Sequence, residues 1–377
     1  MSLHSFYQDK VVACQKEIRR LQDWLNGMAV LRVVLFAAFA WTIYLLIGEF
    51  SGALLFGTFL LAASFIFCVN SYLRWKEKRR LQERLRFLSE NELAQLGGAA
   101  NGFPDGAAWL DNTNYLDDLD IFGPGSLFHS LNRTTTAMGE ATLAALLRQP
   151  LIDPDAIKDQ QQAIRALTPQ ADSRQLLTAT GLVSRELAQH EAGTGKQEVP
   201  DKGSLDRWLN TPPRMTNHGW LAIIISALTL FNLYGLYSLF DNGNYALVVG
   251  LILVSRMVTG IFSPYVNGQH RLIGHQQALL DQYAGILAVF NRIDTTGSPV
   301  LQQLRGQTAR AHTAIRRLSR LTSFFDQRLN LLVNLVLNTF FFYDIFCMMA
   351  LERWKAANRS EFPGWIDAVG TVECLNS

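Results

Sequence analysis

The sequence predicts an all-α protein that combines two transmembrane helical hairpins with a cytoplasmic helical bundle. Three observations predict this class. Charged residues make up only 18% of the 377 residues, against about 25% in typical soluble proteins. Four runs with no charge or one charge have about the 20 apolar residues that a membrane-spanning helix needs. The polar segments carry helical patterns, without the apolar–polar alternation of a half-buried strand.

Composition also excludes several classes of protein. The 34 Lys+Arg and 32 Asp+Glu residues leave a net charge of +2, which excludes a basic nucleic-acid coat and an acidic disordered tail. Hydrophobic residues make up 49% and the mean hydropathy is +0.09, so the chain is not disordered by default. The four cysteines form no C-x-x-C pair and are expected to be reduced thiols: Cys14, Cys68, Cys347 and Cys374.

The first domain, residues 1–100, is predicted to hold an N-terminal helix and the first hairpin. Val33–Gly48 carries no charge for 16 residues, and Phe50–Leu73 carries none for 24. We expect spans at about 30–48 and 50–73, with Arg32 snorkelling to the interface. A polar segment precedes the first run, which argues against a signal peptide. The second helix is expected to continue into the cytoplasm to Leu96, before a glycine-rich break.

The second hairpin is predicted within residues 211–267, as spans at about 219–240 and 243–263. Gly219–Phe240 carries no charge for 22 residues, and Asn242–Val266 carries only Arg256. Snorkelling explains Arg256 simply, and a functional role for an intramembrane charge is the alternative. These spans separate two polar domains, residues 101–210 and 268–377.

The distribution of Lys and Arg predicts the orientation in the membrane. Seven basic residues lie within residues 74–86, whereas the turns around Glu49 and Asp241 contain none. Basic residues concentrate in cytoplasmic loops. We therefore expect an integral protein of the cytoplasmic (inner) membrane, with the N-terminus and the core domain in the cytoplasm. The basic cluster could also bind anionic lipid or nucleic acid, but topology alone explains it.

The polar domains are predicted to be helical. Ser126–Leu131 and Ala137–Arg148 are expected helices, and Asp153 followed by Pro154 marks the start of another that ends near Leu167. Further helices are expected at about 172–190, 270–293 and 300–325. A long helix is expected from Ser323 to about Ala357. In it, three amides spaced four residues apart form one stripe that should face protein, at Asn330, Asn334 and Asn338.

A search for chemistry finds no catalytic or metal-binding constellation. The segment Gly193–Lys196 lacks the G-x-x-x-x-G-K-[ST] spacing of a phosphate loop and is interpreted as a linker. The acidic trio of Asp117, Asp118 and Asp120 has no matched partner and is interpreted as turn and cap residues. A basic stripe on one helix could contact phosphates or be a solvated face. It consists of Arg316, Arg317 and Arg320.

One continuous string suggests a family. Asp118–Phe128 (DLDIFGPGSLF) is followed by Leu131–Gly139 (LNRTTTAMG), then by Pro150-Leu151 and a helix that contains Gln161. This order resembles the start of the core (lever) domain of MutS-family proteins, in particular their membrane-associated branch. Residues 330–354 and 365–377 resemble the returning lever helix and its connector. The resemblance implies a structural role for eight motif residues: Phe122, Gly123, Pro124, Asn132, Arg133, Thr134, Thr136 and Gly139.

The resemblance implies a membrane-anchored core module, the non-catalytic part of an ATPase related to DNA mismatch repair. The sequence also departs from the family. It has no F-x-E mismatch wedge, and a membrane hairpin replaces the DNA-embracing clamp, so binding of mismatched DNA is in doubt. It ends where the family's ATPase domain would begin, so ATP and Mg²⁺ are expected only with that domain. We expect no enzyme activity and no cofactor in this chain, and a homodimer in the intact protein.

Two other functions remain open. A membrane scaffold without DNA binding fits the same architecture. A small transporter would need polar residues along a membrane pathway, and Arg256 alone qualifies in the sequence. The expected partners are therefore the lipid bilayer, a second copy of the chain and, with more doubt, DNA. No small-molecule substrate is indicated.

Overall fold

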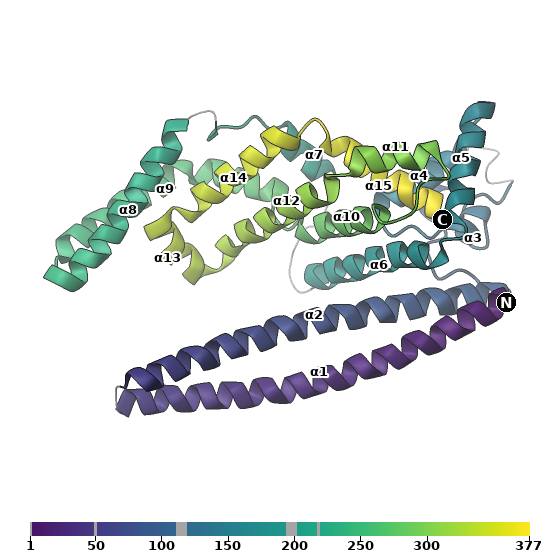
Figure 1. Ribbon diagram of the computed structural model, residues 1–377. Coiled ribbons are helices and arrows are strands. Elements are labelled where there is room, and N and C mark those ends of the chain that lie inside the picture. The colour runs from purple at the N-terminus through teal and green to yellow at the C-terminus, as the bar shows by residue number, and fades with distance from the viewer. Residues whose placement is uncertain (1, 49–50, 111–118, 194–201, 217–218) are drawn as a thin grey trace. The chain divides into compact units, whose positions relative to one another are not determined.

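The computed structural model describes residues 2–48, 51–110, 119–193, 202–216 and 219–377. These residues form α-helices and short 3-10 helices and no strand, which confirms the all-α prediction. The chain divides into two compact units, Met1–Arg133 and Thr134–Ser377 (Figure 1). The boundary lies within the string of sequence that suggested a family.

The first unit is dominated by a hairpin of two long helices, α1 (Leu3–Gly48) and α2 (Gly52–Leu96), which run antiparallel (Figure 1). Each helix joins a predicted span to its polar extension without interruption. Trp24 stacks on Trp75 with ring centroids 6.0 Å apart. The Arg32 guanidinium lies 4.0 Å from the ring centroid of Tyr72, so a cation–π contact across the hairpin holds this charge.

The rest of the first unit is a compact loop with two short helices, η1 (Ala107–Trp109) and α3 (Leu127–Leu131). Ser126 caps α3 by accepting a hydrogen bond from the backbone N–H of His129. Gly106 has φ +77°, and a Cβ there would lie 2.5 Å from the Phe128 ring. Only glycine fits that turn without moving the buried aromatic ring.

The second unit begins with four helices: α4 (Ala137–Arg148), α5 (Pro154–Leu167), α6 (Ala171–Gly193) and α7 (Lys202–Asn210). The observed bounds of α4 equal the predicted ones. Asp153 caps α5 and Pro154 opens it, as the sequence predicts. The side chains of Leu177, Leu205 and Trp208 are buried in the core of the unit.

The second hairpin consists of α8 (Gly219–Asn242) and α9 (Tyr245–Ile273). The helices approach closely at Gly235, where a Cβ would lie 2.5 Å from Leu251 Cδ1. The described residues contain four helices long and apolar enough to cross a membrane, and these are α1, α2, α8 and α9. That agrees in number and place with the sequence prediction, on length and composition alone. α9 continues past the predicted end of its span to Ile273.

The returning chain forms the rest of the core. Its elements are α10 (Gln277–Phe290), α11 (Pro299–Thr308), α12 (Ala311–Asp326), η2 (Gln327–Leu329), α13 (Leu331–Phe341), α14 (Tyr343–Asn358) and α15 (Phe362–Asn376). Leu287, Ile315, Leu318 and Met348 are fully buried. The predicted helix at 300–325 is divided into two helices: α11 ends at Thr308, and α12 begins at Ala311.

The prediction of one helix from Ser323 to Ala357 is wrong. α13 and α14 meet at a bend of 79°. Phe342 lies at the bend with φ +49° and a fully buried ring. Asn338 Oδ1 accepts the backbone N–H of Asp344 at 2.8 Å, and thus replaces a hydrogen bond that the continuous helix would have made. Asn338 is buried, while Leu335 and Val336 on α13 are exposed, so this amide faces protein as predicted. For Asn330 the prediction is wrong, because this residue is exposed and lies before α13, at the end of η2.

Candidate functional site

A buried glutamate joins the last helix of the second unit to the start of α4. The Glu373 carboxylate, on α15, accepts hydrogen bonds from the backbone N–H groups of Thr135 (2.9 Å) and Thr136 (3.2 Å). It also accepts a hydrogen bond from the Thr135 hydroxyl, at 2.5 Å, and another from the Thr136 hydroxyl. Thr136 is the N-cap of α4, since its Oγ1 accepts the Gly139 N–H at 2.9 Å. One carboxylate thus satisfies four donors around a helix start.

The surroundings of Glu373 are tightly packed. Burial raises the pKa of the Glu373 carboxyl, and the hydrogen bonds from Thr135 and Thr136 act in the opposite direction by favouring the charged form. A Cβ on Gly139 would lie 2.2 Å from Glu373 Oε2, and a Cβ on Gly181 would lie 2.0 Å from Thr135 Oγ1. Gln282 donates to the carbonyl oxygens of Thr135 (3.1 Å) and Gly181 (3.0 Å). These contacts connect α4, α6, α10 and α15.

The predicted motif residues fall into two sets. Thr134, Thr136 and Gly139 belong to this junction in the second unit, and all three are buried. The other five lie in the loop of the first unit: Phe122, Gly123, Pro124, Asn132 and Arg133. Phe122 packs on Phe128, and Gly123 takes φ +104°, whereas Pro124 is exposed.

Asn132 and Arg133 hold this loop in the first unit. Asn132 is fully buried and donates to the carbonyl oxygen of Pro104 at 2.9 Å. Arg133 pairs with Glu92 on α2 at 2.6 Å. The amide of Asn101, absent from the prediction, donates to the carbonyl oxygens of His129 and Asn132. These contacts hold the loop in place against α2. None of them places a nucleophile beside a base.

A second buried carboxylate fixes the segment that leads into the second hairpin. Glu352 on α14 accepts the backbone N–H groups of Arg214 (2.9 Å), Met215 (2.9 Å) and Thr216 (2.8 Å). It also accepts the Tyr265 hydroxyl of α9 at 2.5 Å. One helical turn later, the Lys355 ammonium donates to the carbonyl oxygens of Trp208 and Thr211, next to the end of α7. α14 therefore holds the entry to α8 and one face of α9.

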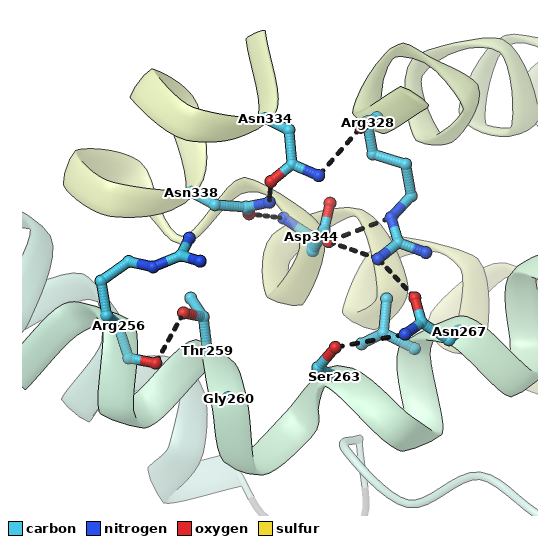
Figure 2. A pocket seen from close by; sticks show the side chains of 10 residues that line it. Arg256, Thr259, Gly260, Ser263, Asn267, Arg328, Asn334, Asn338 and Asp344 are labelled. Atoms are coloured by element: carbon cyan, nitrogen blue, oxygen red, sulfur yellow. Dashed lines mark hydrogen bonds and ion pairs between the residues drawn. The ribbon is translucent and has the colours of Figure 1, made fainter. Parts of the chain in front are cut away.

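Figure 2 shows a polar cavity of about 300 Å³ between α9, α13 and α14. Within it, Arg328 pairs with Asp344 Oδ2 at 2.9 Å and donates to Asn267 Oδ1 at 2.8 Å. The Asn334 amide donates to the Arg328 carbonyl oxygen, and the Asn338 amide donates to Asn334 Oδ1. Two of the amides predicted to face protein therefore line a cavity and order its wall.

Arg256 also lines this cavity, and its side chain extends from α9 toward α13 (Figure 2). Its guanidinium has no hydrogen-bond or ion-pair partner among the described residues. Asp344 Oδ1 is buried and likewise without a hydrogen-bond partner in the described part of the chain. The sequence identified Arg256 and the asparagines Asn334 and Asn338 separately. It did not indicate that they line one cavity, because the break at Phe342 that brings them together was not predicted.

A neighbouring cavity of about 420 Å³ shares Asn267, Arg328 and Asn334 with the first and adds His270 and Arg271. His270 Nε2 lies 2.9 Å from Asp326 Oδ1. The two cavities therefore form one polar region at the side of α9, with the unpaired Arg256 at one end and Arg271 at the other.

The other groups that the sequence identified as candidates form no site within the described part of the chain. The basic stripe of Arg316, Arg317 and Arg320 is exposed on α12, without an ion pair in the described residues. Asp120 has φ +49°, and Asp117 and Asp118 lie outside the described residues, as does Thr194–Lys196 of the predicted linker. Among the residues that the structure describes, no group of His, Cys, Asp or Glu could hold a metal ion.

Comparison with known proteins identifies one similarity. Residues 112–230 match the family model described as MutS domain III. No curated protein and no solved structure matches the chain significantly. The matched segment includes all eight motif residues and runs from the loop of the first unit into α8. The match supports the MutS-like resemblance of the string that begins at Asp118, and the resemblance of residues 330–354 and 365–377 stays a prediction. Across residues 112–230 the chain is therefore similar to MutS domain III.

Proposed function

We propose that this chain is a membrane-anchored, MutS-like core module, the non-catalytic part of a protein related to DNA mismatch repair. The observation that carries the proposal is the extent of the match. Residues 112–230 are similar to MutS domain III, and the same segment continues into α8, one of the four helices of membrane-spanning length. A core module and a membrane anchor are therefore parts of one continuous chain.

The contacts of the second unit support transmission of movement between the core and the hairpin. Glu373 joins α15 to the start of α4, inside the matched segment. Glu352 joins α14 to the residues that precede α8 and to Tyr265 on α9. Buried carboxylates that accept several backbone donors hold helices in one geometry, because a displaced helix would leave those donors unsatisfied. A shift of α14 would therefore move the hairpin with it.

The proposal assigns no reaction to this chain. Its 377 residues contain no G-x-x-x-x-G-K-[ST] motif, so ATP and Mg²⁺ belong to the proposal only through a separate nucleotide-binding domain. The proposed partners are the lipid bilayer, in the inner membrane with the core in the cytoplasm, and a second copy of the chain in an intact relative.

Cysteine accessibility tests the anchor and its orientation. With the native cysteines replaced, Asn242→Cys places one thiol at the turn between α8 and α9, and Lys158→Cys places one on an exposed face of α5. An impermeant thiol reagent should label the first from outside intact cells and the second only after lysis. Labelling of Asn242→Cys from the cytoplasmic side alone would contradict the orientation. Release of the protein by alkaline carbonate would contradict the anchor.

Duplex binding tests the DNA part of the proposal against the scaffold alternative. The exposed stripe of Arg316, Arg317 and Arg320 offers three guanidinium groups that pair with no acidic residue in the described part of the chain. If it contacts DNA, binding should fall steeply with salt, and replacing all three by alanine should reduce that salt dependence. Absence of binding to matched and mismatched duplexes at low salt would leave the membrane scaffold as the function.

A further inference from the structure

The cavity between α9, α13 and α14 has the charge of an anion site. Arg256 and Arg328 bring two positive charges, and Asp344 brings one negative charge. The Arg328–Asp344 pair, at 2.9 Å, is internally neutral. The remaining charge is that of Arg256, which has no partner among the described residues. A guanidinium on a membrane-spanning helix is energetically unfavourable without a counter-charge, so a bound anion would remove an energetic penalty.

The hydrogen-bonding groups of the cavity also fit an acceptor-rich ligand. A guanidinium offers five N–H donors in a planar fork that matches phosphate. The Ser263 oxygen accepts from the Asn267 amide at 3.2 Å, which leaves its own O–H to donate. The Asn338 amide uses one N–H toward Asn334 and has a second. Donors from α9 and α13 therefore face the same space.

One oxygen atom in the cavity is a hydrogen-bond acceptor without a donor. Asp344 Oδ1 is buried and unpaired in the described part of the chain, because Arg328 contacts only Oδ2. A hydroxyl group on the ligand would satisfy this oxygen without adding charge. The lining is thus complementary to a singly charged phosphate ester that also carries a hydroxyl group.

The surface beside Arg256 indicates where such a ligand comes from. Val249 and Leu253 are exposed on α9, by 55% and 66%. They lie within seven residues of Arg256 on the side of the α8–α9 turn, which is toward the bilayer interior in the proposed orientation, on a helix of spanning length. A phospholipid would place its phosphate against Arg256 and its acyl chains along these side chains. A free phosphate would leave that apolar surface unused.

We propose that this cavity binds the headgroup phosphodiester of an anionic, hydroxyl-bearing phospholipid such as phosphatidylglycerol, with Arg256 as the charged contact. This inference rests on the membrane anchor of the proposed function, and it requires neither DNA nor nucleotide. The volume of about 300 Å³ is at the lower end of small-ligand sites. The lipid would connect α9 to α13 next to the bend at Phe342.

The test uses the full chain purified in a neutral detergent. Phosphatidylglycerol, phosphatidylcholine and glycerol 3-phosphate are titrated separately, and binding is measured by native mass spectrometry and by the thermal unfolding midpoint. Phosphatidylglycerol should bind and raise the midpoint, and the other two should not. Arg256→Gln should weaken phosphatidylglycerol binding about tenfold or more, the typical effect of losing a charged hydrogen-bond partner. Arg256→Lys should retain part of the binding.

Arg316→Gln is the matched control, since it removes an exposed arginine from α12 away from the cavity lining. Equal loss in this variant would overturn the proposal, as would equal binding of the two lipids. Binding of glycerol 3-phosphate that depends on Arg256 would show a soluble phosphate as the ligand and would overturn the lipid assignment. Carbonate extraction is scored separately, so a failed lipid site and a failed membrane anchor give different results.

Discussion

Replacing Glu373 by alanine should destabilise the second unit more than any surface change on the same helix. The substitution leaves the backbone N–H groups of Thr135 and Thr136 buried without an acceptor. Each unsatisfied buried donor costs about 1–3 kcal/mol, so the two together cost about 2–6 kcal/mol. Removing a buried charge offsets part of this cost. We expect a net loss of about 2–5 kcal/mol, a large share of the roughly 5–15 kcal/mol typical of a domain.

Urea unfolding of the detergent-solubilised chain, followed by tryptophan fluorescence, measures this loss. The chain has eight tryptophans, and Trp365, buried on α15, contributes to this signal. The control is Glu361→Ala at the start of α15, where the carboxylate pairs with Arg310 and the two side chains are 41% and 65% exposed. Exposed ion pairs contribute about 0–1 kcal/mol. If both substitutions cost the same, or if Glu373→Ala costs less than about 1 kcal/mol, the junction does not stabilise the unit as argued.

Three further predictions concern the same contacts. Gly139→Ala should destabilise the second unit by about 1–3 kcal/mol, because the added methyl group would overpack against Glu373. Gly306→Ala on α11, where an added Cβ meets no other atom, should stabilise it by about 0.5–1 kcal/mol. Thermal unfolding of the two variants gives the sign of each change. Glu352→Gln should speed amide hydrogen exchange at Arg214 and Thr216 and leave exchange in α4 unchanged, and uniform acceleration would refute a local role. Since burial raises the pKa of Glu373 above its ordinary 4.5, the folded chain binds this proton more tightly than the unfolded chain does. Stability should therefore decrease as pH rises from about 4.5 through the folded-state pKa, and Glu373→Gln should remove that part of the profile.

Local chemistry made many elements predictable from the sequence. Apolar runs with no charge or one charge identified the helices of both hairpins, and Asp153-Pro154 identified the start of α5. Both signals depend on a few neighbouring residues, so no tertiary knowledge is needed. The break at Phe342 was not predictable in this way, because residues 331–341 are all compatible with helix. Its hydrogen bonds come from Asn338 and from Asn232 on α8, whose amide lies 3.3 Å from the carbonyl oxygens of Thr339 and Phe340.

The candidate sites show the same limit. The motif residues Thr136 and Gly139 were recognisable, but their partner Glu373 lies far away in the sequence. α15 carries two acidic residues, Asp367 and Glu373, and the sequence alone did not indicate which of them is buried. Arg256 was identified from its charge in an apolar run, yet its surroundings depend on how α13 bends. Pairings of this kind are set by tertiary structure, which one sequence without its fold does not reveal.

The separation of 238 residues between Thr135 and Glu373 also has a consequence for biosynthesis. At about 5–20 residues per second, a ribosome needs roughly 10–50 s to make Glu373 after Thr135. During that interval α8 and α9 leave the ribosome, and the buried donors at the start of α4 still lack their acceptor. The second unit can close around this junction only after Glu373 has been made, which is after both helices of the second hairpin have been made. For the membrane anchor proposed above, the order of translation thus favours insertion of the hairpin first and completion of the core last.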